Sequence, residues 1–207
     1  MYLLDSDVAK KICQYQLLHE LVEALDCGLE GFAVLPQLRF QLKLSNQAKA
    51  VQKLGSEAAV DLAQQLVAHA VEVQIAAEAA NPILELNRPD IDSGEATLFA
   101  ALYDNDSDSL ISGDKRAFIA LSQVNGLPVL DALWARLICI EEAIHYIVRT
   151  ASFGTVSAKI RAMPAVDTAI SIAFGRAKPN PQADVLDALM SYIKDLQRQT
   201  AGKYVLP

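Results

Sequence analysis

Short apolar segments that alternate with longer helical ones are the feature that most constrains the fold of this chain. Apolar runs of strand length stand at residues 1–5, 32–36, 109–112 and 135–140, and a segment with helical spacing or composition follows each of them. Strands that alternate with helices favour a mainly parallel sheet with helices on both faces. The sequence therefore predicts an α/β protein with a three-layer α/β/α domain over residues 1–150.

The predicted helices between these strands are recognised by amphipathic spacing, good helix formers and turn signals at their ends. A break with two prolines and several acids spans residues 81–92, and we expect it to form a loop over a site. The six predicted helices of this domain cover residues 7–26, 36–55, 56–73, 93–105, 113–124 and 141–151.

The last part of the chain, residues 151–207, has no segment typical of a strand. It contains two helical stretches, 166–175 and 183–199, separated by a Lys-Pro-Asn-Pro break. We interpret it as a helical C-terminal extension that packs on the main domain, because its apolar positions need burial. The sequence leaves open whether this extension also forms a homodimer or binds a small protein inhibitor.

Composition excludes several classes of protein. The chain of 207 residues is 52% hydrophobic, which argues against disorder, yet no apolar run approaches the roughly 18 residues that span a membrane. The N-terminal segment lacks the basic start and apolar stretch of a secretory signal. Three cysteines without metal-binding spacing are expected to be reduced, so we expect a cytoplasmic protein. They are Cys13, Cys27 and Cys139.

A formal net charge of −7 argues against a protein that coats nucleic acid with its whole surface. A local basic patch is still compatible with this charge, because several cationic side chains lie near the segments that we expect to form the site. These candidate nucleic-acid-binding residues are Lys10, Arg39, Lys43, Lys115 and Arg116. Each of them alone is also compatible with a solvated helix face.

Three acids are predicted to meet at one edge of the sheet. Asp5 ends the first strand, Asp114 follows the strand at 109–112, and Glu95 lies in the first turn of the preceding helix. The carboxyl ends of parallel strands share an edge, and ligands bind there. Carboxylates that converge repel one another unless a cation joins them, so a site for Mg²⁺ or Mn²⁺ is expected. Stabilisation of helix N-termini is an alternative role for Asp114 and Glu95.

Three motifs together resemble the PIN domain, a family of metal-dependent nucleases found among bacterial toxins and RNA-processing enzymes. They are YLLDSDV, PDIDSGEATLFAAL and LISGDKRA, and the resemblance covers residues 1–145. It implies a PIN-like fold in which Asp5, Glu95 and Asp114 bind metal and position water. It further implies metal-assisted hydrolysis of single-stranded RNA, and a toxin-type protein that a small antitoxin could inhibit.

The resemblance also assigns supporting groups. Asp7 and Ser112 lie beside the acids, and Ser6 is next to Asp5. The family often places a further acid after its second strand, where this chain has Gln41. Either a nearby acid compensates as a metal ligand, or the site is partly degenerate. The candidates for that compensation are Asp7, Asp90 and Asp92.

Two alternatives stay open. Asp5 and Asp7 have the Asp-x-Asp spacing of haloacid-dehalogenase-like phosphatases, in which the first Asp is a nucleophile and the second a general acid. Ser112 would then bind the phosphate, but Glu95 would have no role. The second alternative is a catalytically degenerate PIN-like binding module, which Gln41 and the acidic charge favour.

Overall fold

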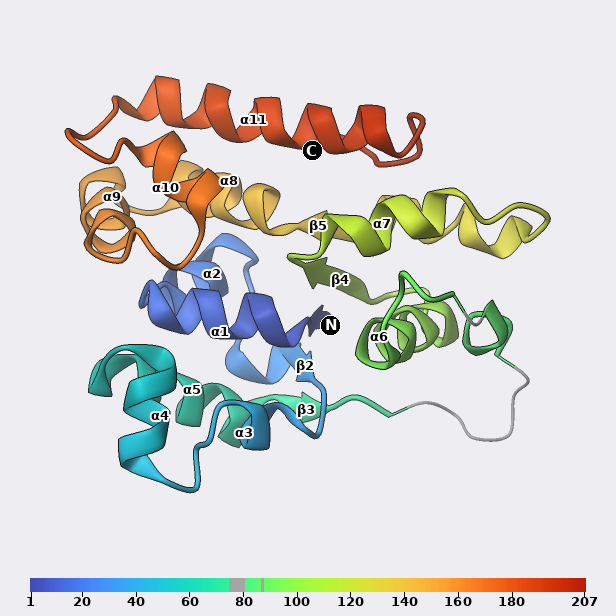
Figure 1. Ribbon diagram of the computed structural model, residues 1–207, viewed down its shortest axis with the longest axis horizontal. Coiled ribbons are helices and arrows are strands. Elements are labelled where there is room, and N and C mark those ends of the chain that lie inside the picture. The colour runs from blue at the N-terminus through green and yellow to red at the C-terminus, as the bar shows by residue number, and fades with distance from the viewer. Residues whose placement is uncertain (75–80, 87) are drawn as a thin grey trace.

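The computed structural model describes residues 1–74, 81–86 and 88–207, and its centre is a parallel sheet of five strands in the order β3-β2-β1-β4-β5 (Figure 1). Asn87, within the predicted loop, lies outside the described residues. Leu3 of β1 pairs with Ala33 of β2 and Leu110 of β4. The strands are β1 (Tyr2–Leu4), β2 (Phe32–Val34), β3 (Val71–Glu72), β4 (Ser109–Ser112) and β5 (Leu137–Cys139). The predicted α/β class and parallel sheet are confirmed.

Helices flank this sheet on both faces. Figure 1 shows α1, α2 and α5 on one side of the strands and α6 and α7 on the other. The helices of the first 150 residues are α1 (Ser6–Gln14), α2 (Leu18–Ala24), α3 (Leu38–Gln41), α4 (Gln47–Leu54), α5 (Glu57–His69), α6 (Ser93–Asp104), α7 (Lys115–Ser122) and α8 (Ile140–Thr150).

Alternate residues of the strands divide the interior into two apolar cores. Leu4 and Ile111 pack in the core beneath α1, α2 and α5, whereas their neighbours Leu3 and Leu110 pack in the core beneath α6 and α7. Successive side chains of a strand point to opposite faces, so a strand in the middle layer needs apolar residues at every position. This is why the strands appear in the sequence as short continuous apolar runs.

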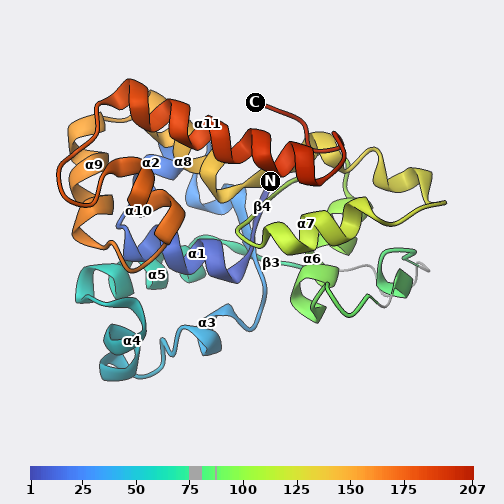
Figure 2. The ribbon, with the colours of Figure 1, turned by 45° about the horizontal axis from the view of Figure 1, so that its top comes forward.

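Three helices complete the chain: α9 (Phe153–Ala162), α10 (Thr168–Phe174) and α11 (Gln182–Gln199). The helix α11 packs along α8, as Figure 2 shows from a second angle. Leu189 of α11 joins the first core and Ile193 the second. The predicted helical C-terminal part is confirmed, but α9 was missed. The boundary between domains 1–150 and 151–207 stays a prediction.

Two long predicted helices were wrong, because each is interrupted. The helix predicted over 7–26 is divided into α1 and α2 at Gln16, which has a left-handed backbone with φ of 57°. The helix predicted over 36–55 is divided into α3 and α4 at Lys43, with φ of 59°. The side chain of Asn46 then caps α4 by accepting the N–H of Lys49 at 3.0 Å.

The end of the helix predicted over 56–73 was also wrong, since α5 ends at His69 and the chain continues as β3. Likewise, the first part of the strand predicted at 135–140 is a 3₁₀ turn, Trp134–Arg136, that precedes β5. The start of α5 is as predicted: Ser56 accepts the N–H of Ala59 at 3.1 Å.

Among the described residues, no helix is both long enough and apolar enough to cross a membrane. All three cysteines are free thiols, and Cys13 and Cys139 are buried.

Candidate metal centre

A cavity of about 510 Å³ lies at the carboxyl edge of β1 and β4, and we call it the acidic cavity. Asp5 enters it from the end of β1, Glu95 from the start of α6, and Asp114 from the turn after β4. These three predicted acids, widely separated in sequence, therefore line one cavity. Its lining residues are Asp5, Asp7, Asp92, Glu95, Gly113, Asp114, Lys115 and Arg116.

The register of the sheet positions Asp5. The Asp5 backbone N–H donates to the carbonyl of Ile111 at 3.0 Å, which fixes Asp5 beside the end of β4. The Ser112 hydroxyl donates to Asp5 Oδ2 at 3.3 Å and accepts the N–H of Asp114 at 3.2 Å. Burial raises the pKa of the Asp5 carboxyl above its ordinary value, and hydrogen bonds from Ser112 and nearby backbone only partly oppose this.

A capping box at the start of α6 positions Glu95. The Asp92 side chain accepts the N–H of Glu95 at 2.8 Å, while Glu95 Oε2 accepts the N–H of Asp92 at 2.8 Å. The pKa of Glu95 is raised to about 7, mainly by burial and in addition by the negative charges of Asp92, Asp114 and Asp5, while the hydrogen bond from the Asp92 backbone opposes the shift. Glu95 is thus an acid that takes up a proton near neutral pH.

Arg116 pairs with Asp114. Its guanidinium donates to Asp114 Oδ2 at 2.7 Å and to Oδ1 at 3.2 Å, and this pairing lowers the pKa of Asp114. Asp114 also caps α7 by accepting the N–H of Arg116 at 2.8 Å. The Arg116 side chain is 87% exposed, so water screens the pair and the guanidinium is free to exchange partners.

The carboxylates share a cavity without forming a closed set of ligands. Among the described residues, no group of three or more His, Cys, Asp and Glu side chains has the arrangement of a metal centre. Glu95 is turned to the Asp92 backbone and Asp114 to Arg116, which accounts for this. The donors themselves are carboxylate oxygens, which suit Mg²⁺ or Mn²⁺. A cation would relieve the repulsion that, after burial, contributes to the raised pKa of Glu95.

Lys115 forms the basic rim of the acidic cavity together with Arg116. Its ammonium pairs with Glu141, which is 3% exposed, and lies 5.5 Å from the centre of the Tyr192 ring. Glu141 was not among the predicted site residues. Its position two residues after β5, at the same sheet edge as Asp5, is a signal that the sequence contained.

Asp7 lines the acidic cavity and also takes part in a network with α10. Lys11 contacts Asp7 Oδ2 and Asp167 Oδ2, both at 2.8 Å. Asp167 in turn caps α10 by accepting the N–H of Ala169 at 2.9 Å. The negative charge of Asp7 is therefore already balanced by the Lys11 ammonium. The negative charge of Asp5, the first residue of the Asp-x-Asp pair, is balanced less.

The other predicted residues lie outside the acidic cavity. Arg39 lines a separate cavity beside Phe40, whereas Lys43, Gln41 and Lys10 line neither of these cavities. Ser6 has a buried hydroxyl with no partner among the described residues, and Asp90 pairs with Arg88 at 2.7 Å. Roles for these residues in binding metal or nucleic acid stay predictions.

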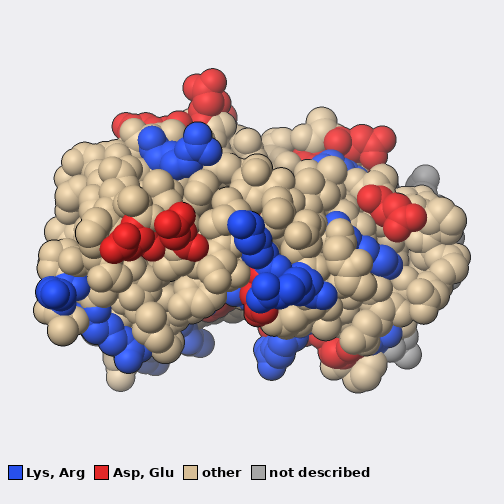
Figure 3. Space-filling model, turned by 90° about the horizontal axis from the view of Figure 1, so that it is seen from above, with Lys and Arg blue, Asp and Glu red and all other residues tan. Residues whose placement is uncertain are grey.

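Acidic and basic side chains lie next to each other on the face seen in Figure 3 and do not separate into two large patches. The acidic cavity likewise has acidic and basic side chains side by side, because Lys115 and Arg116 line it together with the carboxylates. A strand of nucleic acid would therefore meet positive charge locally, although the whole chain carries a net charge of −7.

The raised pKa of Glu95 predicts a gain in stability when the acid is made neutral. In the folded state Glu95 binds a proton up to about pH 7, and an unfolded Glu releases it near pH 4.5, so the carboxyl lowers stability progressively as pH rises between these values. Since Glu95 is only half-buried, we expect Glu95→Gln to raise the free energy of unfolding by roughly 1 kcal/mol at pH 8.

This gain should be smaller at pH 5, and Gln keeps the capping box intact. Urea unfolding in EDTA at both pH values measures it. Equal stability of the two proteins at pH 8 would contradict the raised pKa.

Comparison of the chain with models of protein families, with curated proteins and with solved structures found no match.

Proposed function

We propose that this protein is a PIN-like, metal-dependent ribonuclease that hydrolyses single-stranded RNA in the acidic cavity. One observation carries the proposal: Asp5, Glu95 and Asp114 come from three separate parts of the chain and line one cavity at the carboxyl edge of a parallel sheet. Ligands bind at this edge in open α/β sheets. Mutual repulsion makes such a cluster costly unless a cation is its partner.

Asp5, Glu95 and Asp114 would hold Mg²⁺ or Mn²⁺, and Asp7 and Asp92, which also line the cavity, would assist. When bound, such an ion supplies a nucleophilic water and stabilises charge on a phosphodiester. Glu95 would hold the cation in its charged form, which a neighbouring positive charge favours. Asp114, which pairs with Arg116 here, would hold the cation with the same carboxylate.

Lys115 and Arg116 bind and orient the substrate in this proposal. Their positive charges stand on the rim of the acidic cavity, where they would attract the phosphates of a single strand and offset the negative field of the acids. The buried carboxylate of Glu141 keeps the Lys115 ammonium in place. Ser112 orients Asp5 through its hydroxyl.

The proposed setting is the cytoplasm, since all three cysteines are free thiols. A toxin-type nuclease of this kind would be held inactive by a small protein antitoxin. The C-terminal helices α9 to α11 offer a surface for such an inhibitor or for a second copy of the chain. The antitoxin is inferred from the resemblance to the PIN domain, and the second copy from the need of the C-terminal helices for burial.

A substrate comparison tests the proposal. The purified protein is assayed with Mn²⁺ against a single-stranded RNA and against a generic phosphomonoester, each with and without EDTA. We expect turnover of the RNA alone and its loss in EDTA. Turnover of the ester alone would instead support the phosphatase that uses Asp5 and Asp7. Turnover of neither, with a stable co-purifying partner, would support the binding module.

A further inference from the structure

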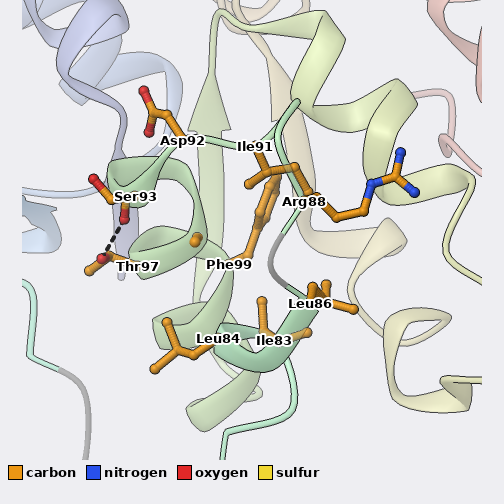
Figure 4. Close-up of a pocket in the computed structure, with 10 residues that line it drawn as sticks. Ile83, Leu84, Leu86, Arg88, Ile91, Asp92, Ser93, Thr97 and Phe99 are labelled. Carbon is orange, nitrogen blue, oxygen red and sulfur yellow. Dashed lines mark hydrogen bonds between the residues drawn. The ribbon is translucent and has the colours of Figure 1, made fainter.

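A second cavity, of about 380 Å³, lies beside the acidic cavity along α6, and we call it the apolar cavity (Figure 4). Asp92 lines both cavities, so the two are adjacent at the start of α6. Its volume lies within the range of about 300 to 1,000 Å³ that is typical of small-molecule sites. A ligand in the acidic cavity could therefore extend into the apolar cavity.

The walls of the apolar cavity suit a flat, apolar group. Figure 4 shows Ile91 and Phe99 on one side and Ile83 and Leu86 facing them. Phe99 is only 1% exposed, so its ring is fixed by the core beneath. A planar ring placed between such walls would remove apolar surface from water on both of its faces.

Polar groups gather at the side of the apolar cavity that joins the acidic cavity. Ser93 and Thr97 lie there together with Asp92 (Figure 4). The Thr97 hydroxyl donates to the carbonyl of Ser93 at 2.7 Å, which leaves its oxygen able to accept a hydrogen bond from a ligand. Few polar groups among apolar walls are typical of sites that select one orientation of a ligand.

Arg88 lines the apolar cavity with its aliphatic stem, whereas its charged group lies outside the cavity. Its guanidinium donates to Asp90 at 2.9 and 2.7 Å and to Gln123 at 3.2 Å, and Figure 4 shows it directed away from the apolar walls. The described residues that line the apolar cavity therefore offer no free cation to a phosphate, in contrast to the rim formed by Lys115 and Arg116. If one ligand carried both a phosphate and an aromatic ring, the phosphate would lie in the acidic cavity and the ring in the apolar cavity.

We propose that the apolar cavity binds one nucleobase of the RNA strand whose phosphodiester lies in the acidic cavity. This inference rests on the proposed function and deepens it, because it names the group that positions the strand. A nucleobase has two apolar faces and a polar edge, as this cavity requires, and it is linked through its sugar to a phosphate. RNA-binding proteins recognise unpaired bases by such contacts.

Equilibrium binding tests the inference without requiring catalysis. The Asp5→Asn protein is titrated with a fluorescent octamer of uridine and with an abasic ribose-phosphate strand of the same length and charge. The two strands make equal ionic contacts, so a difference in affinity reports the bases. We expect the abasic strand to bind about tenfold more weakly, as is typical for the loss of base stacking.

Ala96 lines the apolar cavity, and replacing it with Phe should fill it. We expect Asp5→Asn/Ala96→Phe to bind the uridine strand about tenfold more weakly and the abasic strand unchanged. The matched control is Ala58→Phe in the same background, on the exposed surface of α5, which should keep the preference for the uridine strand. Circular dichroism checks that each variant is folded.

The outcomes separate the two proposals. Equal affinity of the Asp5→Asn protein for both strands would overturn the nucleobase site, even if the wild-type protein cleaves RNA. An unchanged preference in the Ala96→Phe variant would overturn its location. A preference for the uridine strand that Ala96→Phe removes, without any RNA cleavage by the wild-type protein, would support the nucleobase site and overturn the nuclease.

Discussion

Replacing Asp5 with Asn is expected to lower Mn²⁺-dependent cleavage of single-stranded RNA by about 100- to 1,000-fold, the usual effect of removing one preorganised electrostatic contact from an active site. Asp5 is the acid fixed most directly by the sheet, through its N–H bond to Ile111 and its contact with Ser112. Asn has almost the same shape and still accepts the Ser112 hydrogen bond, so the fold should be retained. Single-turnover cleavage rates and circular dichroism measure the two effects.

Asp114→Asn should have an effect of similar size, because Asp114 lines the same cavity from the turn after β4. The matched control is Asp61→Asn. Asp61 is an exposed carboxylate on α5, so this variant should cleave RNA at the wild-type rate. Full activity in both Asp5→Asn and Asp114→Asn would exclude the acidic cavity as the site of cleavage.

The positions of Asp5 and Asp114 could be predicted from the sequence because they depend on a general property of parallel sheets. Asp5 directly follows one short apolar run and Asp114 follows another by two residues. These runs form the neighbouring strands β1 and β4, which pair with Leu4 beside Ile111. The carboxyl ends of the two strands then bring the acids together. The same reasoning applied to β5 would have indicated Glu141, which the resemblance did not include.

The partners of each carboxylate, by contrast, could not be predicted from the strand pattern. Glu95 is turned towards its own helix by the capping box, and Asp114 is paired with Arg116 only two residues further along the chain. Both contacts are local alternatives to a cation. The motif SGEA therefore predicts equally well a helix start and a metal ligand, and the structure contains the helix start.

Two helix interruptions were missed because neither Gln16 nor Lys43 is a typical helix breaker. A left-handed backbone at such residues costs about 1 to 2 kcal/mol, so sequence patterns argue against it. Burial of the following apolar residues offsets this cost: Leu17 and Leu18 are fully buried after Gln16. Tertiary packing thus decides the interruption, and a single sequence does not display it.

The strand β3 was missed for a different reason. It has two residues, Val71 and Glu72, and both are exposed, so it has neither the length nor the apolar pattern of a buried strand. It exists because its backbone pairs with Ala33 and Val34 of β2. An edge strand of this kind is defined by its neighbour and leaves little trace in the sequence.

The second large effect is expected in stability, at Tyr204. This side chain is fully buried, and its hydroxyl donates to Glu142 Oε2 and accepts the N–H of Cys139 at 2.7 Å. Its ring lies 5.9 Å from that of Phe118. Tyr204→Ala should lower the free energy of unfolding by about 3 to 5 kcal/mol, because it leaves a large cavity in the second core.

For a chain of this length, that loss corresponds to a decrease in melting temperature of roughly 6 to 20 °C. Tyr204→Phe keeps the ring but leaves Glu142 with one hydrogen bond fewer, so we expect it to lose about 1 to 3 kcal/mol. Burial raises the pKa of Glu142, and Tyr146 donates to its other oxygen. The carboxyl can therefore respond to the loss of Tyr204 by taking up a proton.

The control is Tyr103→Phe, which removes a hydroxyl from a half-buried tyrosine of α6 and should change stability little. Urea unfolding of the four proteins measures the differences. If Tyr204→Phe were as stable as the wild type while Tyr204→Ala was not, the ring alone would join the C-terminal segment to β5. If both were as stable as the wild type, Tyr204 would have no part in holding α11 and α8 together beside the candidate site.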